Sequence, residues 1–253
     1  MKKWMIGAVL LAMSLTAGAQ NGPQIYNMNF DVWSRTSGAW NLYPHDATPS
    51  QKVWDSANHG MSLLGINGTT PEYKHVAVAG IGKAACRIES KKILWAFVAG
   101  NLYNGEFGRI VKFSGAELHF GVPFTERPKR FTGYYHYLPG TVDFAKAPYL
   151  SMKGKQDEGQ IELILTDWTE PLTIVTNDEE FPDGATNPHV IGRAVIDLKE
   201  ATDGYVHFDI PVEYRSEKTP GYVVITATSS KYGAYFTGAN GSVLYIDEFS
   251  FSY

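Results

Sequence analysis

Aromatic side chains set among polar residues and glycines are the features of this sequence best suited to chemistry. An aromatic ring offers an apolar surface to a ligand, and amide, carboxylate and basic groups beside it can hydrogen-bond to hydroxyl groups. The sequence therefore predicts a binding site for a hydroxyl-rich ligand such as a sugar. Its predicted ligand-binding residues are Trp54, Asn58, Arg127, Tyr134, Asp167, Trp168, Lys231, Tyr232 and Tyr235.

These residues come from well-separated segments, so only the fold can bring them together. The hypothesis is one cluster of four aromatic side chains with three hydrogen-bonding residues beside it. Trp54 and Tyr232 are expected to be exposed because each precedes a polar residue or a glycine in a turn-like segment. The alternative is that these aromatic side chains fill a core, as most Trp and Tyr residues of a β-sandwich do.

No hydrolase motif accompanies these residues. The seven histidines never stand four positions apart as on a zinc-binding helix, and Cys-x-x-Cys and Gly-x-Ser-x-Gly are both missing. A glycosidase needs only two carboxylates, separated by about 5–5.5 Å or 6.5–9.5 Å according to mechanism. Glycoside hydrolysis therefore stays open as an alternative to non-catalytic binding. Neither function is expected to require a cofactor. The carboxylates available for hydrolysis are Glu106, Asp143, Asp157, Glu162, Asp167 and Glu170.

The N-terminus has the three parts of a secretory signal. Lys2 and Lys3 precede a short apolar run, and Ala17 and Ala19 provide the small residues that a signal peptidase recognises. We expect residues 1–19 to be removed and residues 20–253 to be exported. The apolar run is too short to span a membrane, and no other segment is long enough.

The charge and cysteine content argue against nucleic-acid binding and exclude an intramolecular disulfide. The chain carries 22 basic and 26 acidic residues, a net charge of −4, without a basic stripe, so nucleic acid is not an expected partner. The lone Cys86 cannot form an intramolecular disulfide and is expected in the core.

Alternation of apolar and polar residues predicts an all-β protein. In one segment Phe131, Gly133, Tyr135 and Tyr137 share a face, with Tyr134 on the other. Gly-containing turns separate such segments, and no helix-length amphipathic pattern occurs. Further strands are predicted over residues 25–32, 75–78, 84–89, 94–98, 116–120, 161–165, 193–196, 206–212, 222–228 and 243–251, and long loops over 36–73 and 172–187.

Seven motifs in order along the chain carry a family resemblance: residues 54–58, 99–107, 120–128, 133–137, 165–168, 229–238 and 241–249. Together they resemble the putative carbohydrate metabolism domain of Gram-negative gut bacteria. The resemblance implies a single jelly-roll β-sandwich of two antiparallel sheets over residues 20–253, similar to carbohydrate-binding modules. It also implies a glycan ligand and a place in the periplasm, at the cell surface or outside the cell, but no catalytic residues.

The same resemblance implies a structural calcium ion. In jelly-roll binding modules the terminal strands often share calcium, and here they offer Asp31 and Asp247. The alternative is that these carboxylates cap turns or pair with basic residues. A structural or adhesive role with a cell-envelope protein partner is the remaining functional alternative.

Overall fold

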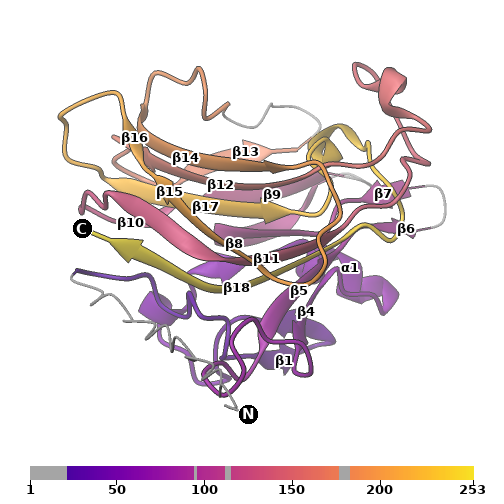
Figure 1. Ribbon diagram of the computed structural model, residues 1–253, viewed down its shortest axis with the longest axis horizontal. Helices are drawn as coiled ribbons and strands as arrows, with labels where there is room; N and C mark the ends of the chain where they lie inside the picture. The colour runs from indigo at the N-terminus through magenta and orange to yellow at the C-terminus, as the bar shows by residue number, and fades with distance from the viewer. Residues whose placement is uncertain (1–21, 94–95, 112–114, 177–182) are drawn as a thin grey trace, which may run out of the picture.

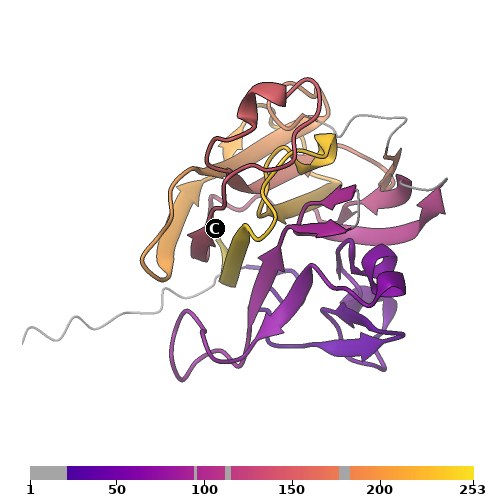
Figure 2. The same ribbon diagram turned by 90° about the vertical axis from the view of Figure 1, so that its right-hand side faces the viewer.

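The computed structural model describes residues 22–93, 96–111, 115–176 and 183–253. Nearly all of its regular structure is β-strand, and every strand pairing within its sheets is antiparallel. Two sheets pack face to face, with the N-terminal strands along one edge of the sandwich (Figures 1 and 2). The prediction of an all-β sandwich of antiparallel sheets is confirmed. The predicted signal, residues 1–19, lies outside the described residues.

The larger sheet has nine strands among the described residues. Seven follow the order β13 (Leu172–Val175), β9 (Gly115–Phe120), β8 (Asn101–Val111), β17 (Tyr222–Thr228), β12 (Gly159–Thr166), β14 (Val190–Leu198) and β16 (Glu213–Tyr214). The two others are β10 (Val122–Pro123), which pairs with β17, and β3 (Trp54–Asp55), which pairs with β8.

Five strands form the smaller sheet in the part of the chain that the structure describes: β15 (Val206–Pro211), β11 (Arg130–Leu138), β18 (Val243–Ser252), β5 (Ala85–Glu89) and β4 (Thr69–Glu72). The chain crosses repeatedly between the sheets, from β11 to β12, β14 to β15 and β17 to β18, as in a jelly roll. The other strands of the described residues form two small hairpins, β1 (Ser34–Thr36) with β2 (Ala39–Asn41) and β6 (Lys91–Ile93) with β7 (Ala96–Val98).

Helical structure is confined to single turns in the described chain. The helix α1 (Asn58–Met61) runs directly into a 3₁₀ turn, and none of these turns is long and apolar enough to cross a membrane. The 3₁₀ turns are η1 (Pro49–Gln51), η2 (Ser62–Leu64), η3 (Leu150–Met152) and η4 (Gly233–Tyr235).

The core lies between the two sheets and follows the predicted alternation. Phe131 and Tyr137 of β11 are fully buried, and the Phe131 ring meets Phe249 edge-on at 5.0 Å. Between them, a β-carbon at Gly133 would come within 2.4 Å of the Phe249 ring, so glycine leaves the space that this ring occupies. Cys86 is buried in the same core, as expected.

Two of the strand predictions were wrong. Residues 25–32 form turns because the Asn27 side chain bonds to the backbone of Val32 in both directions, and Asn27 and Phe30 adopt left-handed φ angles of 55° and 56°. Residues 75–78 lie against the five-stranded sheet as a loop, held by hydrogen bonds such as that from the Ala77 N–H to Asp247.

The two predicted loops also contain regular structure. Residues 36–73 include β2, β3, α1 and β4, and residues 172–175 form strand β13 at the edge of the larger sheet. These elements are two to four residues long, too short to show a period in the sequence.

A groove beside strand β8 as the candidate functional site

Two adjoining cavities of about 510 Å³ and 330 Å³ lie beside β8, and we call them together the groove. The larger arm is bordered by the N-terminal segment, β9 and β10, and the smaller arm by β3 and α1. Both arms are within the size range of small-molecule sites. Four residues line both arms and form what we call the waist: Pro49, Lys52, Gly105 and Glu106.

Close backbone packing builds the waist. The Gly105 N–H donates to the Val53 carbonyl, and a β-carbon at Gly105 would lie 2.0 Å from the His119 carbonyl oxygen. Its φ of 142° is also one that residues with side chains rarely adopt. Only glycine therefore fits here, and it lets the segment before β3 approach the β8–β9 hairpin.

The two charged residues of the waist have no charged partner among the described residues. Lys52 and Glu106 are both exposed, and neither takes part in an ion pair or side-chain hydrogen bond there. The Lys52 ammonium lies 5.5 Å from the centre of the Tyr43 ring. An unpaired ammonium and an unpaired carboxylate in one groove are free to bond with a ligand.

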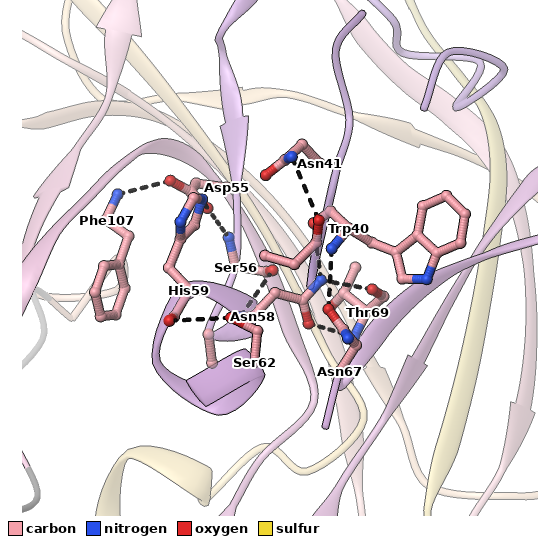
Figure 3. Close-up of polar contacts among 12 residues, drawn as sticks. Trp40, Asn41, Asp55, Ser56, Asn58, His59, Ser62, Asn67, Thr69 and Phe107 are labelled. Atoms are coloured by element: carbon pink, nitrogen blue, oxygen red, sulfur yellow. Dashed lines mark hydrogen bonds and ion pairs between the residues drawn. The ribbon is translucent and has the colours of Figure 1, made fainter. Parts of the chain in front are cut away.

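An Asp–His pair lies in the smaller arm (Figure 3). The Asp55 carboxylate accepts hydrogen bonds from the backbone N–H groups of Ser56 at 2.7 Å and Phe107 at 2.8 Å. His59 Nε2 is 3.4 Å from Asp55 Oδ1, and the His59 ring stacks on Phe107. Burial raises the pKa of Asp55, against the opposing effects of His59 and the two backbone bonds.

Tyr43 adds a neutral phenol to the same arm. Its pKa is raised by burial and further by the carboxylates of Asp55 and Glu106, so its hydroxyl stays protonated at neutral pH. A phenol both donates and accepts. Together with the waist, it gives the groove donors, acceptors and ring surfaces, the combination that a hydroxyl-rich ligand requires.

Trp54 does not present an exposed platform, and that expectation was wrong. The side chain is 1% exposed and packs edge-on against Phe30, and its indole N–H donates to the Tyr26 carbonyl at 2.8 Å. Strand alternation is the reason: Trp54 points into the core, so its neighbour Asp55 points the other way, into the groove.

Asn58 is also buried, with 1% of its surface exposed, so its expected place in an exposed site was wrong. Its amide nitrogen donates to the carbonyls of Trp40 and Thr69, and its amide oxygen accepts from the N–H groups of Gly68 and Thr69 (Figure 3). These four bonds occupy the side chain and tie α1 to β2 and β4.

The other predicted residues lie in three separate places. Asp167 and Trp168 follow β12. The Lys218 ammonium forms an ion pair with Asp167, and the Lys218 carbonyl accepts a hydrogen bond from Arg127, so Lys218 links Asp167 to Arg127. This set is attached to the loop after β16, since Arg127 also donates to Ser216 and lies 4.0 Å from the centre of the Tyr214 ring.

Lys231, Tyr232 and Tyr235 lie at the opposite end of β12, whose eight residues span roughly 26 Å. Tyr149 packs on Tyr232 and Tyr235 with ring centres 4.3 Å and 5.0 Å away. These side chains lie at the end of the sandwich that carries η3 and η4, and this end faces the viewer in Figure 2.

Tyr134 lies on the outer face of the five-stranded sheet, 4.9 Å from the His207 ring. The single aromatic cluster predicted from the sequence was therefore wrong, because its members occupy different ends and faces of the sandwich. Whether any of the exposed members binds a ligand stays a prediction.

Asp31 and Asp247 do converge, as expected. Their carboxylates approach the same point, 3.7 Å and 3.8 Å from where a β-carbon at Gly82 would lie, and Glu248 is 3.1 Å from it. Burial and the neighbouring Asp31 raise the pKa of Asp247 to about 6. No group of three metal-binding side chains with ligand geometry occurs among the described residues, so calcium stays a prediction.

The groove residues went largely unrecognised in the sequence. Glu106 stood among the available carboxylates, but Tyr43, Lys52, Asp55 and His59 were not singled out. The alternation at Trp54-Asp55 was the available signal, since a core Trp directs the following Asp outward. Tyr43 and Lys52 lie in irregular segments, where no period indicates a direction.

The chain as a whole is similar to known proteins that are described in terms of carbohydrates. A crystal structure described as a putative glycoside hydrolase from Bacteroides thetaiotaomicron is 25% identical, with a TM-score of 0.65 over 89% of this chain and 70% of that one. A second of the same description, from Bacteroides vulgatus, is 22% identical, with a TM-score of 0.63 over 88% and 96%.

A carbohydrate-binding module specific for non-crystalline cellulose is 12% identical, with a TM-score of 0.36 over 83% of this chain and 90% of that one. None of the curated proteins matches the chain. The family description "Putative carbohydrate metabolism domain" matches residues 29–252, which is nearly the whole described chain. The chain therefore belongs to the putative carbohydrate metabolism domain family.

Proposed function

We propose that this protein binds a glycan in the groove and does not cleave it. The observation that carries the proposal is the waist, where the Lys52 ammonium and the Glu106 carboxylate have no charged partner among the described residues. Sugar hydroxyls both donate and accept hydrogen bonds, so one sugar can bond to the ammonium and to the carboxylate at the same time. Membership of a carbohydrate-related family supports this choice of ligand.

Glycoside hydrolysis is the second candidate, and Asp55 is the reason to keep it. Its raised pKa is a property of a general acid, and Glu106 lines the same cavity. Both Asp55 oxygens, however, accept backbone N–H bonds that anchor the carboxylate to β3 and β8. This anchoring supports a structural role for Asp55, and hence binding without cleavage.

The experiment that tests the proposal uses residues 20–253 in affinity electrophoresis through gels containing single polysaccharides. We expect retardation by at least one polysaccharide, and Glu106→Gln and Lys52→Met should each weaken it about tenfold or more, as expected for loss of a hydrogen bond to a charged group. Glu213→Gln, on exposed strand β16 at the far edge of the sheet, is the matched control.

Reducing-sugar release separates the two candidates. Retention without release supports binding alone. Release that disappears in Asp55→Asn or Glu106→Gln would instead assign hydrolysis to the groove. If no polysaccharide retards the protein and none is cleaved, the proposal fails.

We further propose that the protein is exported from a Gram-negative cell, on the strength of the signal-like residues 1–19. Intact-mass measurement of secreted or periplasmic material should give the mass of residues 20–253. A full-length mass would contradict this. The destination after export, periplasm or cell exterior, is decided by which fraction contains the processed chain.

A structural calcium ion at Asp31 and Asp247 is proposed on the convergence of their carboxylates around Gly82. Calcium takes six to eight oxygen ligands, which these two carboxylates and nearby backbone carbonyls would begin to supply. An ion that binds only the folded state must raise the melting temperature. A melting temperature that is the same in calcium and in chelator would contradict the proposal.

A further inference from the structure

The two arms of the groove share the waist but differ in chemistry. The smaller arm presents Tyr43, His59 and Phe107 around the Asp55 carboxylate. The larger arm is mainly apolar, with Val122, Pro123 and Phe124 in its wall together with His119. Each arm alone has the volume of a small-ligand site. A ligand that fills both must therefore be extended, with different groups on either side of the waist.

We infer that the groove binds an oligosaccharide rather than a single sugar, with one sugar residue in each arm and the glycosidic bond between them at Lys52 and Glu106. The inference rests on the proposed glycan-binding function and specifies the length of its ligand. It follows from two observations, the shared lining of the arms and the unpaired charges at that shared wall.

The waist is a suitable place for the linkage between two sugars. Lys52 and Glu106 line both arms, so each can reach hydroxyls of the residues on both sides. Gly105 lines both arms as well, and no side chain projects from it between them. The ligand chain can therefore continue from one arm to the other over Gly105.

His119 is the specificity-determining residue of the larger arm. It pairs with Glu106 across the β8–β9 hairpin, so the same hairpin carries the waist and this ring. The Thr173 hydroxyl of β13 holds His119 Nδ1 at 2.9 Å, and Glu117 lies 3.6 Å from Nε2. Because both contacts fix the His119 ring, it presents the same surface to the sugar residue in this arm. This favours one orientation of the glycan chain in the groove.

The smaller arm has its own ordered ring. His59 stacks on Phe107 at 5.8 Å, and Asp55, anchored by the Phe107 N–H, lies within 3.4 Å of it (Figure 3). This arrangement is independent of the Thr173 contact that holds His119. Variants in the two arms therefore probe different parts of the same ligand.

The test measures affinity against ligand length. The probe is a size-fractionated partial hydrolysate, from one to eight residues, of the polysaccharide that retards residues 20–253 most strongly. Titration calorimetry with wild type should show affinity rising at least about tenfold between one sugar and the length that fills both arms. Lys52→Met should weaken binding at every length.

The arm variants give the sharper result. Tyr43→Ala and His119→Ala should each weaken the long oligosaccharide about tenfold, whereas only one of the two should affect the single sugar. Tyr43 is half-buried, so His59→Gln serves as a second variant of the smaller arm if Tyr43→Ala does not fold. Glu213→Gln should bind every length as wild type does.

The outcomes separate the inference from the function on which it rests. Binding that is equally tight for one sugar and for eight, or an arm variant that leaves the long ligand unaffected, overturns the inference but not glycan binding. If no polysaccharide retards the protein, the proposed function fails, and the inference fails with it.

Discussion

Replacing Asn58 by Ala is expected to destabilise the fold by about 4 kcal/mol. The side chain makes four hydrogen bonds to backbone groups, each worth about 1 kcal/mol net. The cost can be larger, because Thr69 and Asn58 are both 1% exposed and water cannot easily replace the lost partners. The effect should therefore exceed that of an ordinary surface substitution several times over.

Urea unfolding followed by tryptophan fluorescence measures this change. The midpoint should fall while the denaturant dependence stays unchanged, since the same surface is exposed on unfolding. Asn67→Ala is the matched control in the same region. Asn67 makes two hydrogen bonds to backbone groups, with the Trp40 N–H and the Gly38 carbonyl, from a more exposed position, so its loss should cost about 1 kcal/mol or less.

Asn58→Asp adds a pH test of the same reasoning. The carboxylate keeps an acceptor for Gly68 and Thr69 but turns its second oxygen toward the carbonyls of Trp40 and Thr69. The folded state therefore favours the protonated acid, and the variant should regain stability as the pH falls. If Asn58→Ala lowers the free energy of unfolding by less than about 1 kcal/mol, or by no more than Asn67→Ala does, the buried hydrogen bonds of Asn58 do not stabilise the fold as argued.

Three further predictions follow from burial and charge. Trp54→Ala should cost about 3–5 kcal/mol in the same urea assay, as expected for a large core side chain, and a small cost would mean that the indole is not core. Gly105→Ala should lower the melting temperature because its β-carbon meets the His119 carbonyl at 2.0 Å, and an unchanged melt would contradict that contact. In chelator, the contribution of Asp247 to the free energy of unfolding should fall by about 3 kcal/mol as pH rises from 3.8 to about 6, because burial and the neighbouring Asp31 raise its folded pKa; an Asp247→Asn variant with the same pH profile as wild type would contradict this.

The alternation of side chains was readable in the sequence wherever strands are long. The pattern in β11 correctly placed Phe131 and Tyr137 in the core and Tyr134 on the opposite face, because successive residues of a strand point to opposite sides. The same rule failed at Asn27 and Phe30, where a side-chain amide competes with strand pairing and supports left-handed turns.

The all-β class, the sandwich and the carbohydrate-related family were predictable from the sequence, because they depend on periodicity and on ordered motifs along the chain. Which polar and aromatic residues lie together depends instead on how distant strands pair. Trp168 and Tyr232 lie at opposite ends of β12, whereas Lys52 and Glu106 line the same groove because β3 pairs with β8. Such pairings join segments about fifty residues apart, and no local pattern records the distance between them.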